Sequence, residues 1–119
     1  MKTESAKIPV NLRAAIPADI PGILEMIREL AEFEKLSDQV VATEADYQES
    51  LFGTSPVAGA LVAVGEGGLV GYAIYFSTFS SFIGRPGLWL EDLYVRPAYR
   101  GLGVGKGLLK AVGEIASER

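Results

Sequence analysis

The spacing of hydrophobic residues predicts two helices in the first half of the chain. Over residues 17–35, apolar side chains recur at helical spacing with charged residues between them, at Ile20, Ile23, Leu24, Ile27, Leu30 and Ala31. Asp19 is placed to cap this helix, and Pro21 suits its first turn. A shorter helix is predicted over residues 43–53, because Thr43 and Asp46 form a capping box and Gly53 marks the exit.

Shorter apolar runs predict strands on either side of a glycine-rich turn. Ile8–Ala15 is short and partly alternating, which favours a first or edge strand. Ala60–Val64 predicts a second strand, and the turn Gly65–Gly68 connects it to a long strand that starts at Leu69. These two strands are therefore expected to form an antiparallel hairpin.

The remaining segments predict one more strand and a last helix. Residues 77–81 are typical of a polar loop or a fraying strand end, and residues 84–87 of a turn. Leu88–Val95 follows as an apolar strand without proline, and a helix runs from about Leu102 to the end. Its inward positions are predicted to be Val104, Leu108, Leu109, Val112, Ile115 and Ala116. The order of strand, helix, helix, three strands and helix indicates an α/β fold with an antiparallel meander.

The composition fits one compact globular domain and narrows the possible chemistry. The 119 residues are 49% hydrophobic and 22% charged, a balance typical of a folded domain. The chain has no cysteine and no histidine, which removes thiol nucleophiles, histidine acid–base catalysis and nearly all zinc sites, so we expect no metal. The formal net charge of −4 argues against a nucleic-acid partner.

The N-terminus and the longest apolar runs indicate where in the cell the protein is expected. Residues 1–7 are polar and do not form a signal peptide, so we expect a flexible tail there and one domain over residues 8–119. The apolar runs are interrupted well short of a membrane span. We therefore expect no membrane association and a cytoplasmic location.

The stretch "YRGLGVGKGLLK" places glycines and positive charge between a strand and a helix. Amides at a helix start are unpaired, and glycines let a ligand approach them closely, so a phosphate or diphosphate fits this turn. The spacing fails both the P-loop and the dinucleotide fingerprint. It does meet the pattern Arg/Gln-x-x-Gly-x-Gly/Ala, through Arg100, Gly103 and Gly105. The alternative is a turn whose glycines only let the helix pack on the sheet.

That pattern resembles the diphosphate loop of the GNAT N-acetyltransferases, which use acetyl-coenzyme A. The stretches "ELAEFEKLSDQVVATEADYQESLFG" and "GYAIYFSTFSSFIGRPGLWLEDLYV" are similar to the spermidine/spermine and thialysine N-acetyltransferases, from about Asn11 onward. The resemblance implies the GNAT (acyl-CoA N-acyltransferase) fold, a mixed, mostly antiparallel sheet with helices on both faces. The coenzyme-binding residues that it implies are Leu93, Tyr94, Val95, Arg100, Gly101, Leu102, Gly103, Val104, Gly105 and Lys106.

Two adjacent carboxylates, Glu91 and Asp92, lie in the last strand. Side chains alternate along a strand, so we expect the two on opposite faces. The resemblance places Glu91 on the substrate side, as amine ligand and catalytic base acting through water, and it makes Phe33 and Glu34 contacts of the amine substrate. The alternatives are structural carboxylates at a strand bulge, and a solvated helix end at Phe33 and Glu34.

The resemblance also implies an activity and an assembly. The reaction is transfer of an acetyl group to a primary amine of a polyamine, diamine or lysine-like small molecule, by direct attack. Members of the family continue beyond the position of Arg119 with a tyrosine that serves as general acid, so we expect the domain to be incomplete here. The alternative is a non-catalytic module that binds coenzyme A or a partner. We also expect a homodimer, because the apolar strand Leu88–Val95 lacks a following strand to cover its edge.

Overall fold

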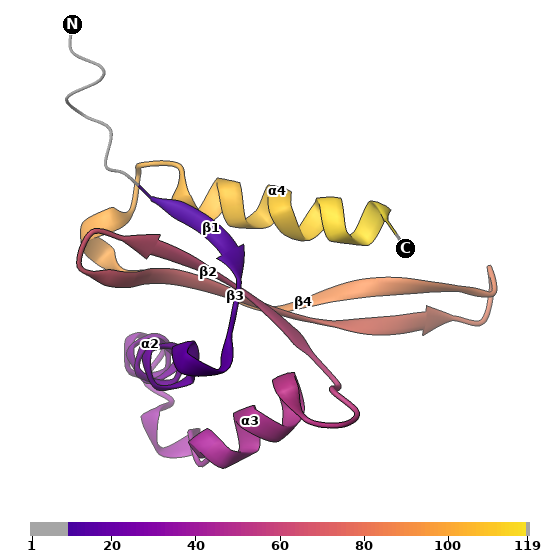
Figure 1. Cartoon of the computed structure of the whole chain (residues 1–119), viewed down its shortest axis with the longest axis horizontal. Helices are drawn as coiled ribbons and strands as arrows, with labels where there is room; N and C mark the ends of the chain where they lie inside the picture. The colour runs from indigo at the N-terminus through magenta and orange to yellow at the C-terminus, as the bar shows by residue number, and fades with distance from the viewer. Residues whose placement is uncertain (1–9, 119) are drawn as a thin grey trace, which may run out of the picture.

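The computed structural model describes residues 10–118, so the predicted tail over residues 1–7 and the start of the first predicted strand lie outside the described residues. The order of elements predicted from the sequence is confirmed (Figure 1). The strands are β1 (Asn11–Ala14), β2 (Gly59–Gly65), β3 (Gly68–Ser80) and β4 (Arg85–Val95). The helices are α2 (Ile20–Phe33), α3 (Glu44–Phe52) and α4 (Val104–Ser117), with short 3-10 turns η1 (Pro17–Asp19), η2 (Ser37–Gln39) and η3 (Pro97–Tyr99).

The strands of the described chain form one antiparallel sheet in the order β1-β2-β3-β4, with helices on both faces. Figure 1 shows α2 and α3 on one side of this sheet and α4 on the other. Two hydrophobic clusters match these layers. The cluster on the α2 and α3 side includes Ile23, Leu24, Met26, Val62 and Tyr72, and the cluster on the α4 side includes Ala63, Ala73, Val104, Leu108 and Val112.

The hydrophobic face of α4 is narrower than predicted. Val104, Leu108 and Val112 are buried as expected, whereas Leu109 is 52% exposed and Ala116 is also exposed. Adjacent residues of a helix point about 100° apart, so Leu108 and Leu109 cannot both face the sheet. The prediction that Leu109 and Ala116 point inward was wrong.

Helix capping follows the sequence at α3 but not at α2. The Thr43 hydroxyl accepts from the Asp46 N–H, and the Asp46 carboxylate accepts from the Thr43 N–H, so the predicted capping box is confirmed. Asp19 does not cap α2 with its side chain. Its carboxylate instead accepts from the guanidinium of Arg13 on β1, at 2.7 and 3.0 Å, and from the Ile16 N–H at 2.8 Å. A charged partner on the neighbouring strand therefore outcompetes the local cap.

The hairpin of β3 and β4 is longer than the sequence indicated. Of the two possibilities predicted for residues 77–81, a polar loop or a fraying strand end, the second is closer, because β3 continues to Ser80. The predicted turn at 84–87 is mostly strand, because Thr78 pairs with Gly87 and Phe79 with Pro86. Pro86 therefore lies inside β4, where an edge strand tolerates proline. Since β2 pairs with β3 only as far as Tyr75, the two strands project beyond the sheet as a ribbon (Figure 1).

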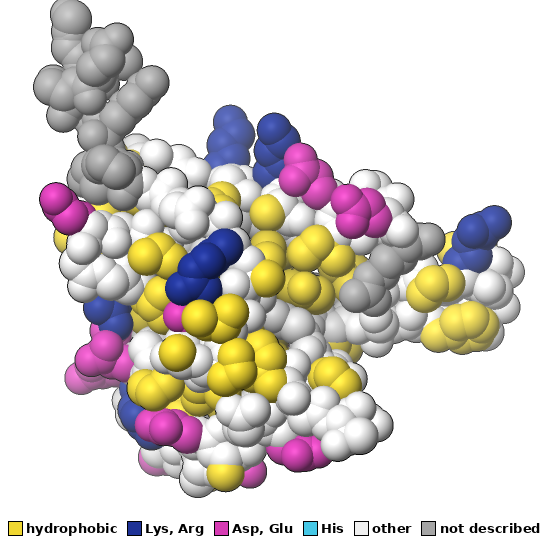
Figure 2. All heavy atoms as spheres, in the orientation of Figure 1, with side chains coloured by type: hydrophobic (Ala, Val, Ile, Leu, Met, Phe, Trp, Pro, Cys, Tyr) yellow, Lys and Arg dark blue, Asp and Glu magenta, His cyan; other side chains and the backbone are white. Residues whose placement is uncertain are grey.

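Hydrophobic side chains lie exposed at the end of this ribbon, as Figure 2 shows, and Phe82 is 99% exposed. Among the described residues, no helix is both long and apolar enough to cross a membrane.

Candidate active site

A β-bulge in β4 lies at the two carboxylates. Ile74 of β3 pairs with Asp92, but the next residue of β3, Tyr75, pairs with Leu90, so Glu91 is the extra residue of β4. The bulge interrupts the alternation of side chains. Leu90 packs on the α4 side of the sheet, whereas Asp92, two residues along, bonds to Tyr72 on the other side. The prediction of opposite faces for Glu91 and Asp92 assumed a regular strand, and at this bulge it stays a prediction.

Asp92 is half-buried beside a buried tyrosine. The Tyr72 hydroxyl donates to its Oδ2 at 3.3 Å, and the Tyr72 side chain has no exposed surface. Burial raises the pKa of Asp92, and the neighbouring Glu91 and Glu34 raise it further, while the hydrogen bond from Tyr72 opposes them. Asp92 thus makes a hydrogen bond within the protein, as the alternative of structural carboxylates at a strand bulge implies, and two other carboxylates influence its pKa.

Tyr47 of α3 completes this group, and the sequence analysis missed it. The ring packs against the cluster that contains Tyr72, so its hydroxyl lies on the same side of the sheet as Asp92. Burial raises the pKa of the Tyr47 hydroxyl, and the charges of Asp92 and Glu91 raise it further. Both carboxylates therefore act on one hydroxyl. We name Glu34, Tyr47, Tyr72, Glu91 and Asp92 the acidic cluster.

The glycine-rich turn before α4 has the backbone that a phosphate loop needs. Gly101 has φ of 80° and Gly103 of 87°, a left-handed conformation that favours glycine. A Cβ added at either position would meet no atom within 4 Å, so both glycines border open space. The first backbone hydrogen bond of α4 runs from the Gly107 N–H to the Gly103 carbonyl. The N–H groups of Val104, Gly105 and Lys106 come before it and therefore have no carbonyl partner within the helix. This arrangement fits a diphosphate group.

Gly105 differs from the other two glycines. A Cβ there would lie 3.5 Å from Cγ2 of Val95, so this position faces β4 at ordinary packing distance. Gly105 can still offer its amide to a phosphate. Leu102, Gly103 and Val104 border a hollow of about 210 Å³, and Lys106 is exposed. The turn thus presents backbone and one lysine charge to the solvent.

Arg100 does not extend toward the open side of the turn. Its Nε donates to the Val95 carbonyl at 2.8 Å, and its guanidinium lies 5.6 Å from the ring centroid of Phe33 and 5.4 Å from that of Tyr94. Phe33 is the last residue of α2 and is 72% exposed. The structure therefore brings together Phe33, predicted to contact the amine, and Arg100, predicted to bind the coenzyme.

The segment Leu93–Val95 connects the acidic cluster to the turn. Tyr94 is buried, and its hydroxyl donates to Glu29 of α2 at 2.8 Å. Burial raises the pKa of Tyr94, and the bond to Glu29 acts in the same direction. Leu93 and Val95 pack on the α4 side. In the described chain β4 pairs with no strand other than β3, so the other edge of Leu93–Val95 has no strand partner, although the Val95 carbonyl accepts from Arg100.

An ion-pair network between α2 and the segment after β4 was also missed. Arg96 lies 2.7 Å from Glu25 and 3.3 Å from Glu29, and its N–H donates to the Val70 carbonyl. The spacing of Glu25 and Glu29 by four residues was a signal that both face one side of the helix. Their partner lies about seventy residues away, and no local pattern identifies it.

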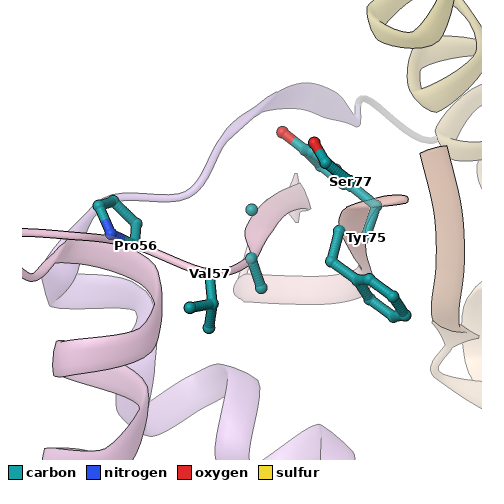
Figure 3. Close-up of a pocket in the computed structure, with 7 residues that line it drawn as sticks. Pro56, Val57, Tyr75 and Ser77 are labelled. Carbon is teal, nitrogen blue, oxygen red and sulfur yellow. The ribbon is translucent and has the colours of Figure 1, made fainter. Parts of the chain in front are cut away.

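A larger hollow than the one beside the glycine turn lies elsewhere. It has a volume of about 580 Å³ and is lined by Pro56, Val57, Ala58, Gly59, Tyr75, Phe76 and Ser77 (Figure 3). None of these side chains is charged, and none belongs to the acidic cluster or to the glycine turn, so we do not include this hollow in the candidate site. Within residues 10–118, no three acidic side chains are grouped in a way that could hold a metal ion.

Comparison with known proteins identifies the family. Residues 24–119 match the model of the "Acetyltransferase (GNAT) family". The chain is 44% identical over 118 residues to thialysine N-epsilon-acetyltransferase of Sus scrofa, covering 92% of this chain and 69% of that protein. It is 40% identical over 113 residues to spermidine/spermine N(1)-acetyltransferase-like protein 1 of Homo sapiens, covering 89% of this chain and 16% of that protein.

Solved structures agree with this family assignment. A putative acetyltransferase from Agrobacterium tumefaciens str. C58 is 28% identical, with a TM-score of 0.74 over 91% of this chain and 74% of that one. The chain therefore belongs to the acetyltransferase (GNAT) family, and the predicted GNAT fold is confirmed. Its activity is that of an acetyl-coenzyme A-dependent N-acetyltransferase, which transfers an acetyl group to an amine.

Proposed function

We propose that the protein acetylates a primary amine of a polyamine, a diamine or a lysine-like small molecule, and that the acidic cluster binds this amine. The observation that carries the proposal is the bulge at Glu91 and Asp92, whose charges raise the pKa of the Tyr47 hydroxyl, while the charge of Glu34 raises the pKa of Asp92. An alkyl ammonium is the natural partner of such a group of carboxylates. The names of the thialysine and spermidine/spermine relatives support an amine of this kind.

In this proposal the exposed carboxylate of Glu91 handles the proton of the amine. A primary amine is mostly protonated near neutral pH and becomes a nucleophile only after it loses a proton. Glu91 accepts that proton through water, and the free amine nitrogen attacks the thioester carbonyl directly. The amide bond forms as the carbon–sulfur bond of the thioester breaks, and coenzyme A leaves as a thiol that takes up the second proton lost by the amine nitrogen. Glu34, at the end of α2, holds a distal ammonium, while the exposed ring of Phe33 packs on the methylene chain.

Acetyl-coenzyme A supplies the acetyl group as a thioester when it is bound. The open side of the glycine turn, with the amides of Leu102 to Lys106, is proposed to hold its diphosphate. The open edge of Leu93–Val95 is proposed to pair with the pantetheine arm, where a backbone amide polarises the thioester carbonyl. These assignments place the thioester beside the acidic cluster, since Leu93 directly follows Asp92.

Glu91→Gln tests the proposed role, because it keeps the size and hydrogen bonding of the side chain but removes the base. We expect turnover of a diamine to fall by at least about 100-fold, which is typical of a lost general base, and the pH profile to change. The affinity for coenzyme A, measured by calorimetry, should stay close to wild type. Glu66→Gln in the exposed turn between β2 and β3 is the matched control. Wild-type turnover of Glu91→Gln across the pH range would show that Glu91 is structural.

The open edge of β4 also supports a homodimer. The strand is 11 residues long, and in the described chain only one of its two edges is paired. Unpaired backbone groups on such an edge can pair with a second chain. The Leu93–Val95 part of that edge is assigned above to the pantetheine arm, so we propose that the interface uses the Leu88–Leu90 part, which follows Pro86 and contains no proline.

A further inference from the structure

The guanidinium of Arg100 is held from three sides. Its Nε donates to the Val95 carbonyl at 2.8 Å, and the rings of Tyr94 and Phe33 lie at 5.4 and 5.6 Å from it. Two of these partners belong to β4, which the sheet fixes in place. The third, Phe33, comes from the end of α2, so Arg100 joins that helix end to the segment before α4.

Phe33 has little other reason for its position. Its side chain is 72% exposed, and it is absent from both hydrophobic clusters. A single exposed apolar side chain is ordinary. Here, however, the ring lies against a cation, and such a contact favours one geometry of the two groups over others.

Arg100 directly precedes the glycine turn, so its position bears on the conformation of that turn. Gly101 and Gly103 have left-handed backbones and no side chains that could pack, and the space beside them is open. Gly101 and Gly103 therefore add no side-chain packing to the turn, and its conformation depends on the residues around them. Val104 is the flank on the helix side and is 6% exposed, which leaves Arg100 as the flank on the strand side.

We propose that Phe33 is a positioning residue for the coenzyme-binding turn and acts through Arg100. This rests on the proposed function, since it takes the glycine turn as the diphosphate site. The Phe33 ring then contributes to the binding of both substrates, because it positions the coenzyme-binding turn and is also the proposed contact of the amine's methylene chain. By linkage, coenzyme binding raises the affinity for the amine by the same factor as the amine raises the affinity for the coenzyme.

The test measures coenzyme A binding by calorimetry without any amine, so that a role of Phe33 in amine binding alone has no effect. Exposed cation–π contacts correspond to about two- to fivefold in an equilibrium constant, so Phe33→Leu should weaken coenzyme A binding by that factor. Phe33→Tyr keeps a ring and should bind like wild type. Phe82→Leu makes the same change at a 99% exposed site of the hairpin tip and should also bind like wild type.

A double-mutant cycle shows whether the effect passes through Arg100. In an Arg100→Met background, Phe33→Leu should have no further effect on coenzyme A binding. An equal effect of Phe33→Leu in both backgrounds, or an effect no larger than that of Phe82→Leu, would overturn the inference. If the wild-type protein itself fails to bind coenzyme A, the proposed diphosphate site is wrong. Binding by wild type with no effect of Phe33→Leu refutes the positioning role alone.

Discussion

A single methyl group added in the glycine turn should affect stability and coenzyme binding to different extents, so it can distinguish the two roles of the turn. Gly103 has φ of 87° and ψ of 4°, and an added Cβ would meet no atom within 4 Å. Gly103→Ala therefore causes no clash, and its cost to folding is the strain of a left-handed alanine, about 1–2 kcal/mol. The same methyl group occupies the open side of the turn, where the diphosphate must approach the amides.

The loss of binding should be larger than the loss of stability. A hydrogen bond from an amide to a charged group contributes roughly 1.5–3 kcal/mol, so losing one corresponds to about a ten- to hundredfold weaker affinity for coenzyme A. Gly113→Ala is the control. Gly113 is exposed in the middle of α4, has an ordinary helical φ, and also has nothing within 4 Å of an added Cβ. That alanine should stabilise the protein by about 0.5–1 kcal/mol and leave binding unchanged.

Urea denaturation measures the two stabilities, and calorimetric titration with coenzyme A measures the two affinities. The expected pattern is a lower unfolding free energy with much weaker binding for Gly103→Ala, and a higher unfolding free energy with wild-type binding for Gly113→Ala. If Gly103→Ala is destabilised yet binds coenzyme A within twofold of Gly113→Ala, the turn is a packing device and not a phosphate site. That was the alternative left open by the sequence.

Two further predictions concern stability and assembly. Asp19 is 7% exposed and bound by Arg13 and the Ile16 amide, so Asp19→Asn should lower the unfolding free energy at pH 7 by about 1–3 kcal/mol. The bond from Arg13 lowers the pKa of Asp19 against the effect of burial, so this stabilisation is present above the unfolded value of about 3.9 and is lost as pH falls through the lower folded value. Urea titrations of both proteins from pH 7 to pH 2 should therefore converge in acid, and a constant gap would contradict the ion pair. Light scattering should give twice the chain mass, and a stable monomer at high concentration would count against pairing through the open edge of β4.

The sequence predicted most of the fold because its strongest signals are local. The apolar spacing of α2, the capping box at Thr43 and the glycine turn before α4 each depend on residues a few positions apart. The ends of β3 and β4 were harder to predict. Residues 77–81 are polar and resemble a loop, and only pairing with a strand further along the chain makes them part of a sheet.

The candidate site shows the same limit. The sequence identified Glu91, Asp92 and the turn, but the prediction assumed regular alternation at a point where the register shifts. A bulge depends on how two strands pair, and a single strand's sequence does not record it. Tyr47 lies in a predicted helix, and nothing near it in the sequence indicates that it meets a strand more than forty residues later.

The plain order of the sheet has a consequence for how the chain folds during its synthesis. Each strand pairs with the strand made just before it, so every new strand meets a partner that already exists. The hairpins of β2, β3 and β4 close short loops at low entropic cost. Among the described strands, only the pairing of β1 with β2 spans a long segment, because α2 and α3 lie between them, as Ala14 opposite Leu61 shows. The Arg13–Asp19 pair joins residues only six positions apart, so it can form before β2 has been made, and in the folded chain it links β1 to the start of α2.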